Sequence, residues 1–423
     1  MPEQTLVGCT LSDGSNTNIT LVDGVISAVG TQREGQLVNV GGLLVLPGLI
    51  DLHAHFREPG AEQSETIETG SRAAVAGGFT TVFAMPNTSP TIDTTQLASR
   101  VRSRGAEVGL IDVFAIAAVT KGLEGEELSQ AIVAGGKDLK IFSDDGVCVT
   151  SPMLMREALR LSAERGSVIS QHAQDPVLAG GGQVAGGIAA VRLGLTEWPN
   201  VAESSIVARD VELAAETGGS LHIAHVSTAE SVEIIRWAKQ RGVKVTAEVT
   251  PHHLLLDQSL AFEFETRFKV NPPLRGAQDR AALLEALVDG TIDLVATDHA
   301  PHARDAKEAE WQAAAFGMIG LQHALGAVQQ ALSQESQLDW QLIQRVMSEQ
   351  PARVAGLTDR GAIKIGKRAD LLAIDPTRFE IVHLDNSQSL SANNPYLGMN
   401  LPSPVVHVWT GGRQLVSEGT MHG

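Results

Sequence analysis

Eight short apolar runs, each followed by a segment with helical spacing, limit most strongly how this chain can fold. The runs are rich in β-branched residues and apolar at most positions, which is typical of strands buried on both faces. They span residues 49–55, 79–85, 110–116, 139–142, 167–172, 220–226, 243–249 and 292–298. Segments between them, such as 152–165, 203–217 and 229–242, carry apolar residues at helical spacing. Eight such units predict a (β/α)₈ barrel of the TIM type, in the α/β class.

An open, doubly wound sheet is the alternative arrangement of such units. That fold commonly carries a glycine-rich phosphate-binding loop after an early strand. Neither G-x-G-x-x-G nor G-x-x-x-x-G-K stands in such a place in this sequence. The barrel is therefore the favoured interpretation.

The two ends of the chain differ from its middle. Residues 1–47 and 358–423 contain short strand-like runs separated by turns, and neither end has a convincing long helix. Neither end could bury much apolar surface alone. We therefore expect both ends to form one small β-sandwich domain beside a barrel domain of residues 48–357.

The composition indicates which kinds of partner are disfavoured and which cellular compartment is expected. The formal net charge of −17 argues against a nucleic-acid or anionic-membrane partner, although a local pocket can still bind a small anion. Cys9 and Cys148 are the only cysteines, which excludes a disulfide scaffold and fits a reducing cytoplasm. No run approaches about 18 uninterrupted apolar residues, and no signal peptide is evident. A cytoplasmic protein is the expectation.

Histidines and acids stand at the carboxyl ends of the predicted strands, where the chemistry of such barrels takes place. The polar residues at these ends are His53, His55, Asn87, Asp144, Asp145, His172, His225 and Asp298. His53 and His55 share one face of their strand because side chains alternate. Imidazole and carboxylate groups are ligands for Zn²⁺ and similar ions. So many of them suit two ions about 3.5–4 Å apart rather than one.

Several motifs in order resemble one known family. "DLHAHFREPG", "AMPNTSPTID", "FSDDG", "HIAHVST", "KVNPPLR" and "ATDHAPH" resemble the amidohydrolase superfamily and, within it, the bacterial type I dihydroorotases. The resemblance runs over essentially the whole chain. It implies reversible cyclisation of N-carbamoyl-L-aspartate to L-dihydroorotate, a step in de novo pyrimidine (UMP) synthesis. It also implies two divalent metal ions per subunit, with zinc as the expected metal.

The resemblance assigns the metal ligands one by one. They are His53, His55, Asp145, His172, His225 and Asp298. Asp298 is also the expected catalytic residue, which takes a proton from a metal-activated hydroxide and gives it to the leaving ring nitrogen. His172 stands in "SQHAQD", where related sequences more commonly have His-Cys-Glu-Asp.

Some assignments leave an alternative open. Many relatives bridge the metals with a carboxylated lysine, and Lys140 stands near that place, but Asp145 of "DDG" is the favoured bridge. His222 is expected to face away from the site and to be structural. His252 and His253 are candidates for an indirect role behind the ligands.

The substrate contacts also follow from the resemblance. Arg57 would bind the substrate carboxylate with its planar fork. The other expected contacts are His55, Asn87, Asn271, His302, Phe316 and Gly317. The charged segment 302–314 follows the eighth strand and could form a mobile lid.

Two other functions compete with the dihydroorotase interpretation. One is another cyclic amidase, such as a hydantoinase or allantoinase, which would not need Arg57 for an α-carboxylate. The other is a non-catalytic subunit associated with a transcarbamoylase, but such relatives usually lose metal ligands. The expected partners are the small substrate, further copies of this chain in a homo-oligomer and, as an open possibility, aspartate transcarbamoylase.

Overall fold

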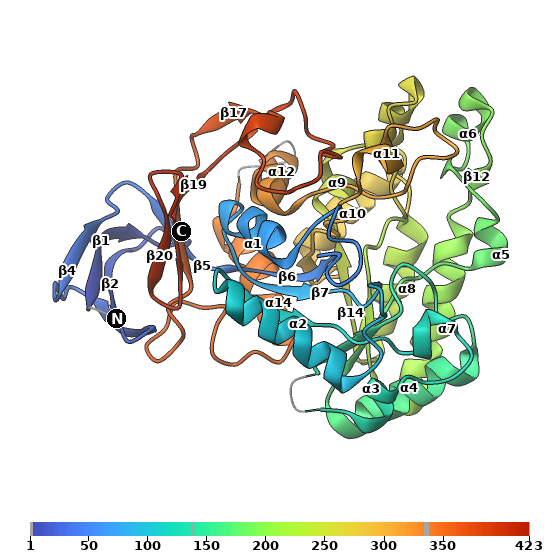
Figure 1. The fold of residues 1–423 in the computed structure, drawn as a ribbon, viewed down its shortest axis with the longest axis horizontal. Coiled ribbons are helices and arrows are strands. Elements are labelled where there is room, and N and C mark those ends of the chain that lie inside the picture. The colour runs from blue at the N-terminus through green and yellow to red at the C-terminus, as the bar shows by residue number, and fades with distance from the viewer. Residues whose placement is uncertain (1–2, 137–138, 334–337, 423) are drawn as a thin grey trace.

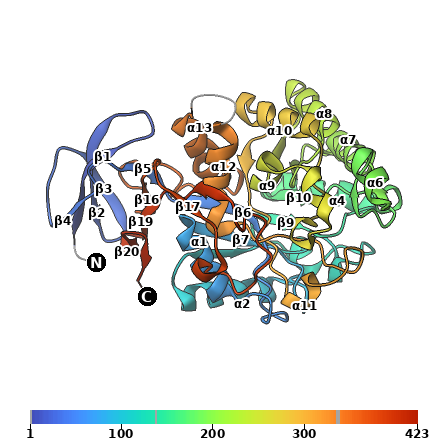
Figure 2. The same cartoon turned by 90° about the horizontal axis from the view of Figure 1, so that it is seen from above.

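The computed structural model describes residues 3–136, 139–333 and 338–422. Eight parallel strands follow one another in chain order around a barrel (Figures 1 and 2). They are β6 (Leu49–Ala54), β7 (Phe79–Ala84), β8 (Asp112–Ala115), β9 (Ile141–Ser143), β10 (Val168–Gln171), β13 (Ser220–Ile223), β14 (Val245–Val249) and β15 (Leu294–Val295). Parallel bridges between Ala117 and Phe142 and between Ala54 and His299 join the two arcs of the barrel. The predicted (β/α)₈ barrel is confirmed.

Helices cover the outside of the barrel. The principal ones are α1 (Ile67–Ala76), α2 (Thr95–Val108), α4 (Pro152–Arg165), α7 (Val201–Thr217), α8 (Ala229–Gln240), α10 (Ala277–Asp289) and α12 (Ala324–Ser333). Helix α4 illustrates how local residues determine where a helix begins and ends. The Ser151 hydroxyl accepts a hydrogen bond from the Leu154 amide, Pro152 occupies the first turn, and Gly166 ends the helix in the left-handed region.

Both ends of the chain contribute to one sheet, which lies at the left of Figure 1. Its N-terminal strands are β1 (Gln4–Thr10), β2 (Asn16–Val22), β3 (Val25–Gly30), β4 (Gln36–Asn39) and β5 (Leu44–Pro47). Its C-terminal strands are β16 (Leu371–Ile374), β19 (Val405–Thr410), β20 (Arg413–Ser417) and β21 (Thr420–Met421). The halves meet where β5 runs antiparallel to β16, with Leu44 opposite Ile374. The division at residues 47 and 358 stays a prediction.

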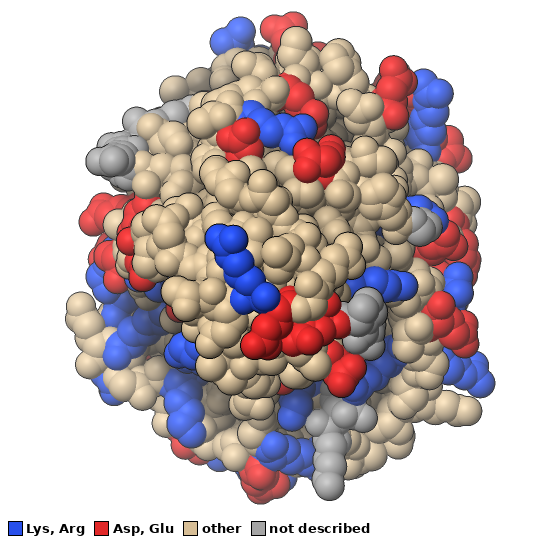
Figure 3. Space-filling model, turned by 90° about the vertical axis from the view of Figure 1, so that its left-hand side faces the viewer, with Lys and Arg blue, Asp and Glu red and all other residues tan. Residues whose placement is uncertain are grey.

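The sheet has a core of its own. Leu6, Ile19, Ala373 and Trp409 belong to one cluster of buried side chains that is separate from the barrel cluster. At the face of this end of the molecule, acidic and basic side chains are interspersed (Figure 3). In the part of the chain that the structure describes, no helix has the length and apolar character needed to cross a membrane.

Two long excursions from the regular pattern reach toward the barrel mouth. Between β10 and α7 lie α5 (Pro176–Ala179), β11 (Val184–Ala185), α6 (Ile188–Leu193) and β12 (Glu197–Trp198). Near the C-terminus, β17 (Phe379–Ile381) pairs with β18 (Asn400–Pro402). The segment between these two strands places Asn393 against the barrel, where its amide donates to the carbonyl of Ala300 at 2.9 Å. The site is therefore framed by parts of the chain far apart in sequence.

Candidate active site

The structure brings the predicted metal ligands together at one mouth of the barrel. Asp145 lies among four imidazoles. Its Oδ1 is 3.4 Å from His53 Nε2, 3.2 Å from His172 Nδ1 and 3.3 Å from His225 Nε2, and its Oδ2 is 3.4 Å from His55 Nε2. All of these side chains are buried. Two groups of nearby donor atoms result, one of His53, His55 and Asp298, the other of His53, Asp145 and His225.

The candidate ligands stand at or just beyond the strand ends. His53 lies within β6, whereas His225 and Asp298 follow β13 and β15 by two and three residues. Both later residues have positive φ, 33° for His225 and 47° for Asp298. Non-glycine residues rarely adopt this conformation, and when they do they cluster at functional sites. The backbone thus turns each of these two side chains toward the common centre.

Glu248 of β14 orients His53 from behind. One oxygen of its carboxylate accepts a hydrogen bond from His53 Nδ1 at 2.6 Å, and the other contacts His222 Nε2 at 3.0 Å. With its proton on Nδ1, His53 presents a lone pair on Nε2. That nitrogen is buried and has no hydrogen-bond partner among the described residues, and it faces Asp145 and Asp298, each at 3.4 Å. A buried lone pair facing two carboxylates fits a cation.

The pKa values of the site residues also fit a bound cation. Burial lowers the pKa of His53, but the neighbouring charges of Asp145 and Glu248 outweigh burial and raise this pKa well above its usual value. Burial raises the pKa of Asp145, but the charge of His53 and hydrogen bonds from His172 and His225 hold this pKa well below its usual range. The carboxylates are therefore ionised. A metal ion can supply the positive charge that balances them, in place of protons.

Asp144 and Asp145 are neighbours with different surroundings. Asp144 Oδ1 accepts hydrogen bonds from the amides of Val119 at 2.8 Å and Thr120 at 2.9 Å, and its Oδ2 accepts one from the Thr120 hydroxyl. Asp144 thus binds the loop after β8, whereas Asp145 contacts the histidines. Lys140 is half-buried just before β9. These contacts favour Asp145 as the bridging ligand, which stays a prediction.

Asn87 and Asn271 lie beside different histidines of the cluster. Asn87 Oδ1 accepts a hydrogen bond from His55 Nδ1 at 2.9 Å, so this side chain also orients a ligand. Asn271 Nδ2 donates to Gln174 Oε1 at 3.0 Å and lies 3.4 Å from His172 Nε2. The buried Oδ1 of Asn271 has no hydrogen-bond partner among the described residues, so it can accept a hydrogen bond from a ligand.

Arg57 and His302 lie beside the same mouth. The Arg57 Nε donates to the carbonyl of Pro301 at 3.0 Å, and burial lowers the pKa of its guanidinium to about 10. His302 Nε2 donates to the carbonyl of Phe316 at 2.7 Å. Gly317 has φ of 142°, and a Cβ built there would lie 2.7 Å from His302 Nε2. Glycine is therefore required for His302 and the 316–317 backbone to approach each other.

Comparisons with known proteins agree with this geometry. A dihydroorotase of Leifsonia xyli subsp. xyli is 48% identical over 100% of this chain and 98% of its own length. The chain belongs to the dihydroorotase family. A dihydroorotase of Streptomyces coelicolor is 47% identical over 96% of this chain and 97% of its own length. A "Dihydro-orotase-like" family model matches residues 42–231, and an "Amidohydrolase family" model matches residues 256–416.

Solved structures extend the likeness to the fold. An L-hydantoinase (dihydropyrimidinase) from Arthrobacter aurescens superposes with a TM-score of 0.89 at 26% identity, over 100% of this chain and 98% of the other. A dihydropyrimidinase from Brevibacillus agri superposes with a TM-score of 0.86 at 20% identity, over 99% of this chain and 96% of the other. The dihydroorotase family and these enzymes thus share one architecture.

One expectation about the site was wrong. His222 does not point away from the site, because its Nε2 contacts the Glu248 carboxylate that holds His53. The expectation extended the alternation of a strand as far as His225, but β13 ends at Ile223 and the backbone turns before His225. His222 therefore lies behind the candidate ligand His53, on the other oxygen of Glu248.

Two functional neighbours escaped the sequence reasoning. The first is Glu248, whose signal is a single acid inside the apolar run 243–249. The second is Gln174, whose Oε1 accepts hydrogen bonds from His172 Nε2 at 2.6 Å and from Asn271 at 3.0 Å. Gln174 stands where related sequences more commonly have glutamate, and it keeps the acceptor oxygen that orients the His172 ring.

His252 and His253 occupy α9 (Pro251–Leu255), behind the mouth. The Thr250 hydroxyl donates to His253 Nδ1 at 2.7 Å, and His253 Nε2 donates to the carbonyl of Pro272 at 3.1 Å. Burial lowers the pKa of His253 to about 3, so the ring is neutral. His253 thus holds the backbone next to Asn271, while the indirect role predicted for both histidines stays a prediction.

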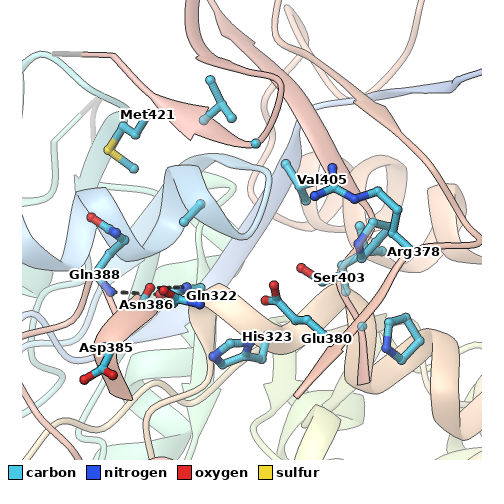
Figure 4. A pocket seen from close by; sticks show the side chains of 17 residues that line it. Gln322, His323, Arg378, Glu380, Asp385, Asn386, Gln388, Ser403, Val405 and Met421 are labelled. Carbon is cyan, nitrogen blue, oxygen red and sulfur yellow. Dashed lines mark hydrogen bonds between the residues drawn. The ribbon is translucent and has the colours of Figure 1, made fainter. Parts of the chain in front are cut away.

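A separate cavity of about 360 Å³ lies between the barrel and the C-terminal strands (Figure 4). Its lining includes Arg378 and Glu380 and also Gln322, which donates to the carbonyl of Asn386 at 2.8 Å and accepts from the amide of Gln388 at 2.9 Å. The lining includes none of the described candidate metal ligands. This cavity is therefore separate from the histidine cluster.

Proposed function

We propose that this chain is a dihydroorotase, which interconverts N-carbamoyl-L-aspartate and L-dihydroorotate. The relatives named dihydroorotase match nearly the full length of the chain at close to half identity. The observation that carries the proposal is the meeting of four histidines and two aspartates at one barrel mouth, with Arg57 beside them. Such a site suits hydrolysis or closure of a cyclic amide on a substrate with a carboxylate.

The cluster would hold two divalent cations, with zinc as the preferred metal for imidazole and carboxylate donors. His53, His55 and Asp298 would hold one cation and His172 and His225 the other, and Asp145 would be a ligand shared by both. The chemistry that such cations supply when bound is a lower pKa for a water molecule and polarisation of a carbonyl oxygen.

Asp298 is the proposed proton carrier. Its Oδ1 lies 3.1 Å from His55 Nε2 and 3.4 Å from His53 Nε2. Burial raises the pKa of Asp298, but the charges of His53 and His55 overcome burial and hold this pKa far below its usual range, so the side chain is ionised. In the hydrolytic direction Asp298 would accept the proton of the attacking water and deliver it to the ring nitrogen that leaves.

Arg57, with its planar fork of donors, is the proposed partner of the substrate carboxylate. Its Nε is engaged by the carbonyl of Pro301, which aims the remaining N–H groups of the fork. The Asn87 amide group, the open Oδ1 of Asn271, His302 and the backbone of Phe316 and Gly317 would orient the rest of the ring.

The rival cyclic amidases share the fold, as the hydantoinase structures show. Dihydroorotate carries a carboxylate next to its ring, whereas hydantoin and allantoin do not. Turnover of the three substrates by metal-loaded protein, measured side by side, separates the functions. The proposal expects turnover of dihydroorotate above the other two, and faster turnover of hydantoin or allantoin would reject it. A metal-free purified protein that stays inactive with added zinc would instead support a non-catalytic subunit.

Assembly and location are further proposals that rest on the resemblance and on composition. A homo-oligomer and association with aspartate transcarbamoylase are proposed from the family resemblance alone. A cytoplasmic location is proposed because the chain has two cysteines, and both are free in the structure.

A further inference from the structure

Two buried lysines, Lys269 and Lys307, lie side by side near the barrel mouth without belonging to the ligand cluster. Lys269 is 1% exposed and Lys307 is 6% exposed. Backbone carbonyl oxygens surround each ammonium nitrogen. Lys269 Nζ donates to the carbonyls of Trp311 at 2.6 Å, Ala314 at 2.7 Å and Gln312 at 3.3 Å, and Lys307 Nζ donates to those of Ala315 at 2.9 Å, Gly317 at 3.0 Å and Lys269 at 3.1 Å.

The acceptors require ammonium groups. A carbonyl oxygen only accepts, so three of them around one nitrogen need three N–H donors, and lysine alone supplies three on a single atom. Such burial has a cost, because an ammonium loses its water. Burial lowers the pKa of Lys269 to about 8, and burial together with repulsion by Lys269 lowers that of Lys307 to about 7. Two buried lysines kept at this cost indicate a task beyond packing.

The carbonyls held by the lysines belong to a segment with three predicted substrate contacts at or beside it. Lys269 Nζ also lies 4.3 Å from the centre of the Phe316 ring. The Phe316 carbonyl receives the hydrogen bond from His302, and the Gly317 amide donates to the carbonyl of Lys269 at 3.0 Å. Residue 271, the predicted Asn contact, follows Lys269 by two positions. The lysines thus join the two segments that would face opposite parts of one ligand.

The rest of the segment is anchored by aromatic side chains. The Trp311 ring is buried against Val184 and Ala189, and its Nε1 donates to the carbonyl of Gln183 at 3.4 Å. Phe316 packs edge-on against Trp198, with ring centres 5.9 Å apart. The stretch expected to be a mobile lid is therefore fastened at its C-terminal part, and the lysines are the polar component of that fastening.

We propose that Lys269 and Lys307 are positioning residues that fix the backbone of residues 311–317 in the shape that receives the pyrimidine ring. The proposal deepens the proposed dihydroorotase function and rests on it. Lys307 holds the carbonyls of Ala315 and Gly317, on either side of Phe316, and Lys269 Nζ lies over the Phe316 ring. The Phe316 carbonyl fixed in this way accepts the hydrogen bond from His302. The two lysines contact the backbone of residues 311–317 and not the candidate metal ligands. Their loss should therefore weaken substrate binding more than it slows turnover.

The test compares Lys269→Met and Lys307→Met with Lys244→Met as a control. Lys244 donates to a single backbone carbonyl, that of Gly218 at 3.2 Å, on the surface. Loss of one charged set of hydrogen bonds should raise KM for dihydroorotate about tenfold or more, while kcat changes less than about threefold and bound zinc stays the same. The control should keep the KM of the parent. Folded, zinc-loaded variants with the KM of the parent would overturn the proposal.

Hydrogen exchange of the unaltered protein keeps the proposal testable where a variant does not fold. Without substrate, the Gly317 amide should exchange slowly with solvent, because the fixed backbone of residues 311–317 keeps this amide hydrogen-bonded to the Lys269 carbonyl. Exchange as fast as in the exposed residues 304–305 would overturn the proposal. The exchange result does not depend on activity. If the parent fails to turn over dihydroorotate, the proposed function fails. The exchange rate alone then tests whether the lysines fix the backbone of residues 311–317.

Discussion

At the scale of single residues, the environment of His53 explains most of the site. Its Nδ1 is held by Glu248 and its Nε2 faces two aspartates. The sequence could predict His53 as a ligand, because a histidine at a strand end in a barrel points to the mouth. It could not predict Glu248 as the partner, because that contact joins strands 195 positions apart and depends on the packing of the barrel interior.

Glu248→Gln should weaken the binding of zinc by about 10–100-fold, because the amide can no longer fix the His53 tautomer with a full negative charge. Competition with a chelator of known affinity measures the change. Glu216→Gln is a matched control, since Glu216 pairs with Arg156 on the surface. Equal zinc affinity in Glu248→Gln and the parent would show that the contact does not tune the site.

Asp298→Ala should keep most of the fold and lose turnover by about a hundredfold to ten-thousandfold, because the proton carrier is removed. The measurement is kcat in both directions on protein whose metal content has been determined. Since Asp298 is also a proposed ligand, the comparison is made at saturating zinc. Near-normal kcat in the metal-loaded variant would contradict the assignment.

At the scale of elements, the strands build the barrel, and the residues at their carboxyl ends form the candidate site. The helical periodicity predicted helices such as α4 well, because caps such as Ser151 and Gly166 are local signals. Strand ends were less predictable, because hydrogen bonding to neighbouring strands sets them. The run 292–298 yields only β15 (Leu294–Val295), and the turn that follows aims Asp298 at the site.

Asp144→Ala should lower the free energy of unfolding by about 3 kcal/mol, because the buried amides of Val119 and Thr120 lose their acceptor. Asp145→Ala should cost less in metal-free protein and instead reduce zinc binding. Urea denaturation of both metal-free variants measures the difference. A larger loss of stability for Asp145→Ala than for Asp144→Ala would contradict this division between neighbours.

At the scale of the whole molecule, the site depends on segments from both ends of the chain. Composition and turn signals predicted that both ends contain β structure, and β5 indeed pairs with β16. The approach of the segment between β17 and β18 to the barrel mouth was not predictable, because its signals are isolated polar residues. There the Asn393 amide bridges the carbonyls of Ala300 and Gly317, next to Asp298 and His302.

Removal of metal should lower the melting temperature of the whole barrel, because bound cations stabilise only the folded arrangement of ligands from different strands. Zinc at 1,000 times its dissociation constant would add about 4 kcal/mol to the free energy of unfolding. Calorimetry with chelator and with restored zinc measures the shift. An unchanged melting temperature would mean that the cluster does not bind zinc tightly in the folded state.

The most direct measurement of the central claim is anomalous X-ray diffraction from crystals grown with zinc. Two anomalous peaks per chain are expected at the barrel mouth, one beside His55 and Asp298 and one beside His172 and His225, with Asp145 between them. A single peak, or peaks away from these side chains, would contradict the central claim.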